Sequence, residues 1–327
     1  MTVRIISEEH DRWMGAMVGL AIGDQMGSLV EGKTYGSYDR IRELTEGSFW
    51  TDDTSQSLCI ADSLISKGEF DINDILQRMV DWLFNGYLSY QDWGYGCGPT
   101  ARLAITGFRD LGKPSPSDQT TNGALMRLAP VPLFFSKNME TAIEMSGRSS
   151  TTTHDDPICV DACRLYGSMI VKAFKGGTKS EILNYEENLW ANDGLKEPID
   201  KIARGSYKHK EPPPITGNLD ALNSGHLGMR PPDDTSKNEE SPYIKGTLDM
   251  VESLEASIWA YDRTSSFAEG AMRAVNLGDD TDTTAAIFGQ LGGAHYGYSG
   301  IPESWKVKLV DRSLVEYIAL KLYECYQ

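Results

Sequence analysis

Two acidic clusters, more than two hundred residues apart, constrain this sequence most strongly. The first is Thr51-Asp52-Asp53-Thr54, and the second runs from Gly278 to Thr284 as Gly-Asp-Asp-Thr-Asp-Thr-Thr. Each cluster leads directly into an apolar pattern of helical spacing. Crowded carboxylates repel one another unless a cation lies between them. A fold that joins the two clusters would supply the all-oxygen shell that hard divalent cations prefer. The sequence therefore predicts a metal site assembled from distant segments.

Length, charge and cysteine usage narrow the class of protein. The chain has 327 residues and a formal net charge of −16, which disfavours broad electrostatic binding to nucleic acid or to an anionic membrane. Five cysteines without regular spacing favour reduced thiols over a disulfide framework. No signal peptide is recognisable, and no apolar run approaches the roughly 18–20 residues that span a bilayer. We expect a soluble, cytoplasmic monomer.

Helical periodicity covers most of the chain. Trp13, Met17 and Leu20 recur at helical spacing, as do Leu58, Ala61, Leu64 and Ile65. Alternating runs of β-branched residues are nearly absent, so a sheet has little support. The fold class that we predict is all-α. Further helices are expected over residues 99–110, 123–134, 139–147, 156–175, 179–192, 247–262, 265–276, 281–295 and 312–325.

One stretch, from about 192 to 242, breaks this pattern. It is polar and contains Pro212-Pro213-Pro214, Pro231-Pro232 and Asp233-Asp234. Because strong helical patterns lie on both sides, we interpret it as an irregular insertion within a single domain that spans residues 1–327. A solvated loop is the simplest interpretation, although long loops also form lids and substrate contacts.

Two segments near the first acidic cluster also have a plain structural interpretation. Gly15, Gly19, Gly23 and Gly27 recur every four residues, a spacing that lets a second helix approach closely. Glu31 follows them and, taken alone, is an ordinary surface carboxylate. The first acidic cluster by itself fits a helix N-terminus, where acidic residues are favoured.

The second cluster shifts the balance toward metal binding, because a helix cap does not need three aspartates in four residues. Asp280, Asp282 and Thr283 offer oxygen ligands without His or Cys, which indicates Mg²⁺ or Mn²⁺ rather than Zn²⁺. Asp282 lies centrally in the cluster, and we expect it to bridge two ions.

Two further motifs suggest contacts with a ligand. Asn122-Gly123 precedes an apolar pattern, and exposed N–H groups at a helix start are suited to phosphate or diphosphate. His154 ends a hydroxyl-rich run that begins at Ser149, and such a histidine is more often structural than catalytic.

In this order, the motifs resemble those of the ADP-ribosylglycohydrolase family, which includes dinitrogenase-reductase-activating glycohydrolases and the ADP-ribosylarginine and ADP-ribosylserine hydrolases. The resemblance extends from about Trp13 to Trp305. Its motifs are Thr51–Thr54, Asn276–Thr283, Ser253–Ala256 and Gly289–Gly297.

The resemblance implies a single compact orthogonal helical bundle with a binuclear Mg²⁺ or Mn²⁺ centre in a cleft. The implied metal ligands are Thr51, Asp52, Asp53, Asp280, Asp282 and Thr283. Glu31, Asp52 and Asp53 are the candidate acid–base residues. The segments implied to line the ADP-ribose site contain Asn122, Gly123, His154, Gly96, Cys97 and Gly98.

The departures from the family pattern lie in loops expected to recognise the acceptor, which is the group to which ADP-ribose is attached. Gly96 and Pro99 stand where arginine-type bacterial members carry an Asp and an Asn, and Leu248-Asp249-Met250 stands where many members have Gly-Tyr-Val. A guanidinium needs a carboxylate or a similar acceptor. We therefore expect weak hydrolysis of ADP-ribosylarginine unless Asp249 reaches the cleft.

The function that we predict is metal-dependent hydrolysis of the glycosidic bond between ADP-ribose and a modified acceptor. Cleavage at an anomeric carbon builds positive charge on that carbon. Carboxylates can stabilise this charge, and a bound metal can activate the water that attacks the carbon. The expected partner is an ADP-ribosylated protein or a small molecule that contains ADP-ribose. The alternatives are an ADP-ribose-binding or structural family member without turnover, and a different two-metal phosphoester hydrolase.

Overall fold

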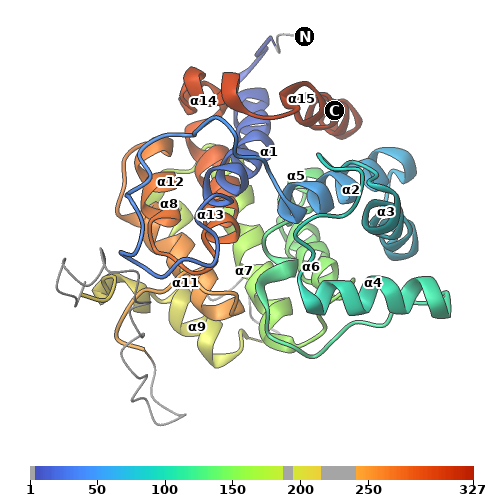
Figure 1. Ribbon diagram of the computed structural model, residues 1–327, viewed down its shortest axis with the longest axis horizontal. Coiled ribbons are helices and arrows are strands. Elements are labelled where there is room, and N and C mark those ends of the chain that lie inside the picture. The colour runs from blue at the N-terminus through green and yellow to red at the C-terminus, as the bar shows by residue number, and fades with distance from the viewer. Residues whose placement is uncertain (1–3, 187–193, 215–240) are drawn as a thin grey trace.

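The computed structural model describes residues 4–186, 194–214 and 241–327. Over these residues the chain is helical and forms no β-strand, only three isolated bridges (Figure 1). The longer helices are α1 Glu8–Gly27, α2 Asp52–Lys67, α3 Ile72–Asn85, α4 Pro99–Leu111, α6 Met139–Ser150, α7 Pro157–Phe174, α11 Met250–Asp262, α12 Phe267–Val275, α13 Thr281–Tyr296 and α15 Arg312–Tyr326. The short ones are η1 Asn122–Ala124, α5 Pro130–Phe134, α8 Lys179–Ile182, α9 Glu197–Ala203, η3 Ser206–His209, η4 Tyr298–Gly300 and α14 Glu303–Lys308. The predicted all-α class is confirmed.

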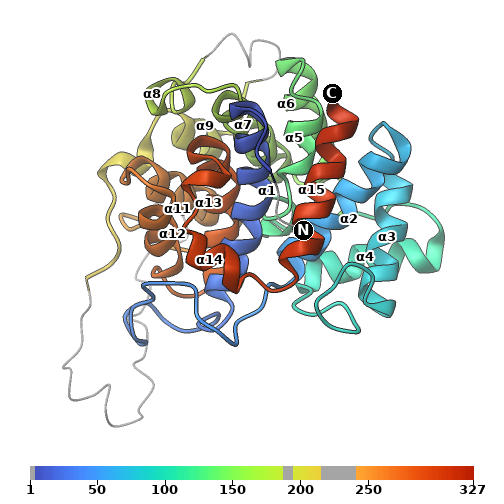
Figure 2. The same cartoon turned by 90° about the horizontal axis from the view of Figure 1, so that it is seen from above.

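Helices α1 and α13 lie side by side at the centre of the molecule (Figures 1 and 2). The glycines of α1 explain how closely they pack. A Cβ atom added to Gly15, Gly19 or Gly23 would overlap the backbone of α13, so only glycine permits this approach. The four-residue spacing of the glycines therefore serves helix packing.

The other helices surround this central pair. Helices α11 and α12 pack against α13 on one side, and α15 and α2 lie on the side of α1, with α3 and α4 beyond them (Figure 2). Trp13, Trp82 and Trp259 are among the largest buried side chains. This arrangement places the C-terminal end of α1 beside the N-terminal ends of α2 and α13, where both acidic clusters lie.

Two predicted helices are wrong in extent. The segment 123–134 contains only η1 and α5, because Pro130 and Pro132 lack the N–H that a continuous helix needs and α5 starts at Pro130. The helix predicted over 179–192 ends at Ile182, after which Lys172 of α7 binds the carbonyl oxygen of Asn184 at 3.0 Å. Residues 187–192 lie outside the described part.

The segment predicted to be an irregular insertion is partly helical. Helices α9 and η3 lie within 194–214, and Ile199 and Ile202 bury their side chains there. Proline at the start of α9 is a helix-start signal that apolar periodicity alone does not show. Pro231-Pro232 and Asp233-Asp234 lie outside the described residues.

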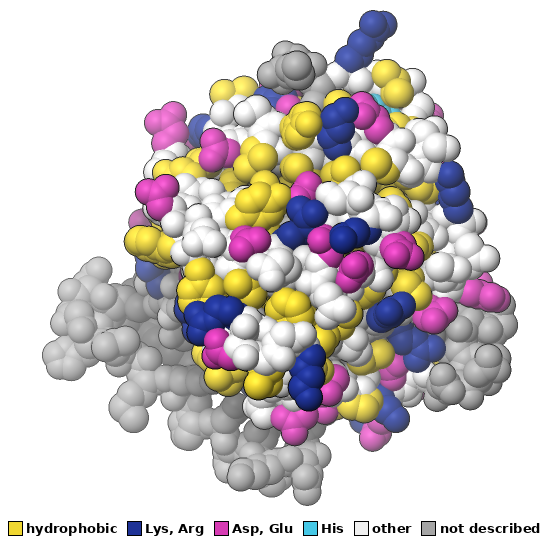
Figure 3. Space-filling model, turned by 90° about the vertical axis from the view of Figure 1, so that its right-hand side faces the viewer, with side chains coloured by type: hydrophobic (Ala, Val, Ile, Leu, Met, Phe, Trp, Pro, Cys, Tyr) yellow, Lys and Arg dark blue, Asp and Glu magenta, His cyan; other side chains and the backbone are white. Residues whose placement is uncertain are grey.

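The face that carries α3 and α4 shows hydrophobic side chains interspersed with acidic and basic ones (Figure 3). Neither charge sign dominates this view. None of the helices in the described ranges combines the length and apolar character that a bilayer crossing requires.

Candidate active site

Asp24, in α1, holds the first acidic cluster in place. Its carboxylate oxygens accept hydrogen bonds of 2.6–3.0 Å from the backbone N–H and the hydroxyl of both Thr51 and Thr54. Burial raises the pKa of Asp24 to about 6, although these hydrogen bonds oppose the shift. The bonds fix the start of α2, so Asp52 and Asp53 occupy its first turn, where the helix dipole favours negative charge.

A tight turn before α13 positions the second cluster. Gly278 and Asp279 both adopt left-handed backbone angles, with φ of 78° and 58°. The Asp279 carbonyl accepts from the Gly32 amide, and the Asp279 amide donates to the Lys33 carbonyl, both at 2.7 Å. This pairing ties the segment after α1 to the turn and thereby brings Glu31 to the second cluster.

The two clusters meet in space, as the sequence predicts. Carboxylate oxygens of Asp24, Asp53 and Asp282 lie within 4.8 Å of one another, and the same holds for Glu31, Asp280 and Asp282. Asp282 is the member common to both groups. Three chain segments that are remote in sequence thus converge on one residue of α13.

The electrostatics of this convergence favour a bound cation. Burial, together with Asp24 and Asp280, raises the pKa of Asp52 to about 8. Burial first, and neighbouring carboxylates second, also hold the pKa values of Asp53 and Asp282 well above the usual range. The buried Asp53 Oδ1 has no hydrogen-bond partner among the described residues. An acceptor left without a donor among crowded carboxylates is an arrangement that a divalent cation would satisfy.

The donor set fits Mg²⁺ or Mn²⁺. Every nearby candidate ligand is a carboxylate or hydroxyl oxygen, which hard cations prefer. Thr51 lies 3.3 Å from Asp53 Oδ2, and the Thr283 amide donates to Asp282 Oδ1 at 2.9 Å, so both threonines are close to the carboxylates.

A cleft of about 730 Å³ opens above the acidic groups, a size typical of small-molecule sites. Six acidic residues line it, and Lys245 is the one Lys or Arg among the described lining residues. Its walls include Glu31, Asp52, Gly96–Ala101, Thr121–Gly123, Met126, His154, Lys245, Thr247, Leu248, Glu252, Asp279, Asp280, Asp282 and Thr283. Thr51 and Asp53 are buried and do not belong to this lining.

One rim of the cleft, formed by Gly96, Cys97, Gly98 and Pro99, packs against Asp52 of the first acidic cluster. Gly96 has a φ of 85°, and a Cβ placed there would lie 2.7 Å from Asp52 Oδ1. Only glycine therefore permits this approach. Burial, followed by the charge of Asp52, raises the pKa of the Cys97 thiol to about 12. A thiol that stays protonated is a poor nucleophile, so Cys97 serves as a wall of the cleft.

The opposite wall contains Asn122, Gly123 and His154. The Asn122 side chain donates to Asp280 Oδ2 at 2.7 Å, so Asn122 supports the second cluster directly. A Cβ on Gly123 would lie 3.1 Å from His154 Cε1, which shows that the imidazole packs against this turn. The expected long helix start is absent here, because η1 is a single turn of three residues.

Asp249 does not reach the cleft. It caps α11 by accepting hydrogen bonds from the amides of Val251 and Glu252, at 2.9 and 3.1 Å. Asp249 is not among the residues that line the cleft. It is therefore not placed to receive a guanidinium.

Four residues of the site were not identified from the sequence: Asp24, Gln56, Arg127 and Lys245. Asp24 had a detectable signal, since it is a single acidic residue within the glycine-rich apolar stretch of α1. Gln56 lies one helical turn after Asp52 and donates to it at 3.0 Å. Arg127 and Lys245 carry no local pattern that distinguishes them from surface cations.

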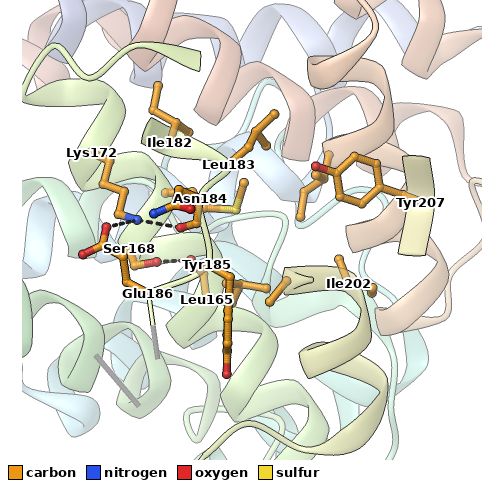
Figure 4. Close-up of a pocket in the computed structure, with 13 residues that line it drawn as sticks. Leu165, Ser168, Lys172, Ile182, Leu183, Asn184, Tyr185, Glu186, Ile202 and Tyr207 are labelled. Atoms are coloured by element: carbon orange, nitrogen blue, oxygen red, sulfur yellow. Dashed lines mark hydrogen bonds and ion pairs between the residues drawn. The ribbon is translucent and has the colours of Figure 1, made fainter. Parts of the chain in front are cut away.

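A second cavity, of about 20 Å³, lies among α7, α8 and α9 (Figure 4). It has room for about one water molecule. Lys172 already pairs there with Glu186 at 2.6 Å and with the carbonyl of Asn184. This cavity is too small for an organic ligand.

A family model and several known proteins match almost the whole chain. The family model for ADP-ribosylglycohydrolase matches residues 6–327. The ADP-ribosylarginine hydrolase Tri1 of Serratia proteamaculans (strain 568) is 31% identical over 97% of this chain and 80% of its own length. The ADP-ribosyl-[dinitrogen reductase] glycohydrolase of Rhodospirillum rubrum is 28% identical over 92% of this chain and 90% of its own length.

A solved structure supports the same assignment. It is described as an ADP-ribosylglycohydrolase-related protein complex and superimposes with a TM-score of 0.78 at 30% identity, covering 98% of this chain and 100% of that one. The helical fold and these matches together identify the chain as a glycosidic-bond hydrolase of the all-α class. The chain belongs to the ADP-ribosylglycohydrolase family.

Proposed function

We propose that this protein hydrolyses the glycosidic bond that joins ADP-ribose to a modified acceptor, and that the reaction depends on two divalent cations, Mg²⁺ or Mn²⁺. The observation that carries the proposal is the convergence of two carboxylate groups on Asp282, beneath an open cleft. Family membership and the names of the relatives support the ADP-ribosyl chemistry.

The residues proposed to hold the ions are Thr51, Asp52, Asp53, Asp280, Asp282 and Thr283. The shared position of Asp282 supports a bridging role. When bound, such ions lower the pKa of water and orient ribose hydroxyls. Asp24 belongs to one of the two carboxylate groups, but both of its oxygens already accept hydrogen bonds from Thr51 and Thr54, so we assign it the role of holding the Thr51–Thr54 segment in place. Asn122 holds Asp280 in the same way. Supporting contacts of this kind keep metal-binding side chains in position.

Glu31 is the proposed general base. It lines the cleft, and its pKa is raised by burial first and by the charge of Asp280 second. A carboxylate with a raised pKa accepts a proton from water more readily near neutral pH. The water would attack the anomeric carbon as the bond to the acceptor breaks, and the departing acceptor must receive a proton. Asp52, which also lines the cleft, is the alternative acid–base residue.

The diphosphate of ADP-ribose is proposed to lie along the wall formed by Thr121, Asn122 and Gly123. The placement does not need a long helix start. It rests on the hydroxyl and amide groups of that wall and on Lys245, which lines the same cleft as a cation and lies 3.6 Å from Glu252.

The rim of the cleft bears on which acceptor linkage the protein cleaves. Two bacterial relatives, 31% and 29% identical, are named ADP-ribosylarginine hydrolases, so an arginine linkage is the first to test. The Gly96–Pro99 rim argues for weak recognition of a guanidinium, because it offers no side-chain acceptor and Asp249 is engaged as a helix cap. We propose that this rim sets the acceptor preference.

The test is a comparison of substrates with one enzyme preparation. ADP-ribose linked to arginine, serine, nucleic acid or an O-acyl group is incubated with the protein and Mg²⁺ or Mn²⁺, and free ADP-ribose is separated and quantified. Asp282→Ala serves as the inactive control. Release from at least one linkage by the wild type alone is expected. Binding of ADP-ribose without release from any of the four linkages would instead favour a protein that binds ADP-ribose without hydrolysing its conjugates.

A further inference from the structure

Arg127 is a fully buried cation that contacts two polar side chains. Its exposed surface is 0%, and burial lowers its pKa to about 10, so it remains charged at neutral pH. One guanidinium nitrogen donates to Gln56 Oε1, and another donates to the Thr153 hydroxyl at 2.6 Å. A guanidinium has donors only, so the direction of both bonds is fixed.

The Thr153 contact determines the position of the hydrogen on His154. Thr153 Oγ1 lies 2.7 Å from His154 Nδ1. Because Thr153 already accepts from Arg127 and is fully buried, its own hydrogen has His154 Nδ1 as the acceptor within the described structure. If Nδ1 carried the proton instead, the hydroxyl hydrogen of Thr153 would be buried without a partner, at a cost of about 1–3 kcal/mol.

The proton of a neutral His154 therefore lies on Nε2. Burial, reinforced by the charge of Arg127, lowers the pKa of His154 to about 3, which keeps the ring neutral. His154 Nε2 lies 2.7 Å from Thr121 Oγ1, so Nε2–H donates to this oxygen. The hydroxyl hydrogen of Thr121 is then not used by His154. Thr121 lines the cleft, where its hydrogen can be donated to a bound molecule.

The Gln56 contact sets the orientation of a side-chain amide in the same way. Arg127 must meet the amide oxygen, so the amide nitrogen of Gln56 faces Asp52 Oδ2 and donates to it at 3.0 Å. The flipped amide would place two donors against each other at Arg127 and an oxygen against the Asp52 carboxylate. Gln56 is fully buried, which makes such mismatches costly.

We propose that Arg127 is a positioning residue that orients donors at both ends of the site: through Gln56 toward Asp52, and through Thr153, His154 and Thr121 toward an anionic oxygen of the ligand. The ligand is identified by its chemistry as a phosphate-bearing molecule, and this part rests on the proposed function. The orientation of the hydrogens does not rest on it, because the orientation follows from the donors and acceptors of the free protein.

The tautomer of His154 is the first measurement. Nitrogen-15 NMR of histidine-labelled protein without ligand should show His154 neutral at pH 7, with Nε2 protonated and Nδ1 unprotonated. Thr153→Val removes the donor to Nδ1 and should abolish this preference, whereas Thr153→Ser should retain it. A protonated Nδ1 in the wild type would overturn the network.

The affinity for ADP-ribose is the second measurement, made by calorimetry. Thr121→Val and Thr153→Val should each weaken binding about tenfold, which corresponds to about 1.4 kcal/mol, and the double variant should be little worse than either. Thr121→Ser and Thr153→Ser should bind ADP-ribose like the wild type, and the affinity for Mn²⁺ should not change in any of these five variants. An unchanged affinity of Thr121→Val for ADP-ribose would contradict the branch of the network that runs from Arg127 through Thr153, His154 and Thr121 to the ligand.

Gln56→Leu tests the other branch of the network, which runs from Arg127 through Gln56 to Asp52. This variant should weaken Mn²⁺ binding and leave the His154 tautomer as in the wild type. Unchanged Mn²⁺ binding together with a changed His154 tautomer would refute the division into two branches. If the wild type bound no ADP-ribose at all, the proposed function would fail, and so would the branch of the network that leads through Thr121 to the ligand. The NMR result would still decide the orientation of His154.

Discussion

Gly27 of α1 lies directly against the backbone of Asp282 in α13, so closely that a Cβ atom on Gly27 would overlap it. Gly15, Gly19, Gly23 and Gly27 form a glycine stripe along which α1 packs against α13. This stripe therefore ends at Asp282, the residue common to the two carboxylate groups. Helix packing and the geometry of the acidic groups are consequently parts of the same contact.

The glycine stripe predicts a large loss of stability in Gly23→Ala. Its new methyl group would overlap the backbone of Ala285, and overpacking of this kind costs about 1–3 kcal/mol. Gly107→Ala is the matched control, since Gly107 lies in helix α4 and its nearest neighbour would be in ordinary contact at 3.5 Å. Urea unfolding should show Gly23→Ala destabilised and Gly107→Ala unchanged or slightly stabilised. Equal stability of the two variants would contradict the packing argument.

Asp282→Ala should lose metal binding or weaken it at least about tenfold, equivalent to about 1.4 kcal/mol. The reason is that Asp282 belongs to both carboxylate groups, whereas Asp279 belongs to neither. Asp279→Asn is therefore the control, and asparagine tolerates the left-handed backbone at this position. Calorimetry with Mn²⁺ gives the stoichiometry as well as the affinity. An Asp282→Ala variant that binds like the wild type would refute the assignment.

How far the sequence predicted this site depended on whether a residue belonged to a recognisable cluster of like side chains. The pairing of Asp52-Asp53 with Asp280-Asp282 was predictable, because carboxylates crowded at two helix starts repel one another unless a cation binds between them. Glu31 required the family resemblance, since only the turn at Gly278-Asp279 brings it to the second cluster.

Other parts of the site were beyond sequence reasoning. The partners of Arg127 are 71 and 26 residues away, and no local periodicity links them. The helix predicted over 123–134 is interrupted for a local reason instead, because the apolar spacing that predicts it includes two prolines, at 130 and 132.

The burial of His154 predicts a pH dependence of stability. Its pKa is about 3 in the folded protein, below the ordinary value of 6.5, so folding favours the neutral ring. This contribution is complete above pH 6.5 and is lost as the pH falls from 6.5 toward 3. Between pH 6.5 and pH 5 the wild type should lose up to about 2 kcal/mol relative to His154→Gln, which lacks the titrating group. Urea unfolding of both proteins at pH 7.5 and pH 5 measures the difference. A stability gap that is constant with pH would contradict a buried neutral His154.

The rim of the cleft predicts the acceptor preference. With Gly96 and Pro99 at the rim, turnover of arginine-linked ADP-ribose should not exceed that of serine-linked ADP-ribose at equal metal concentration. Pro99 is exposed, and Pro99→Asn adds an amide side chain, so this variant should shift the ratio of the two rates toward arginine. Leu103→Asn, on an exposed part of the same helix, controls for an added amide that lies away from the cleft. A wild type that strongly prefers the arginine linkage would show that the rim does not set specificity.

The most direct measurement of the central claim is metal-restored turnover. Protein treated with EDTA is returned to Mg²⁺ or Mn²⁺, and the release of ADP-ribose from the best substrate is followed as a function of metal concentration, for the wild type and for Asp282→Ala. We predict no release without metal, full recovery in the wild type and none in the variant at the metal concentration that saturates the wild type. Undiminished release in EDTA, or equal rates for the two proteins, would contradict a hydrolase that works through this acidic centre.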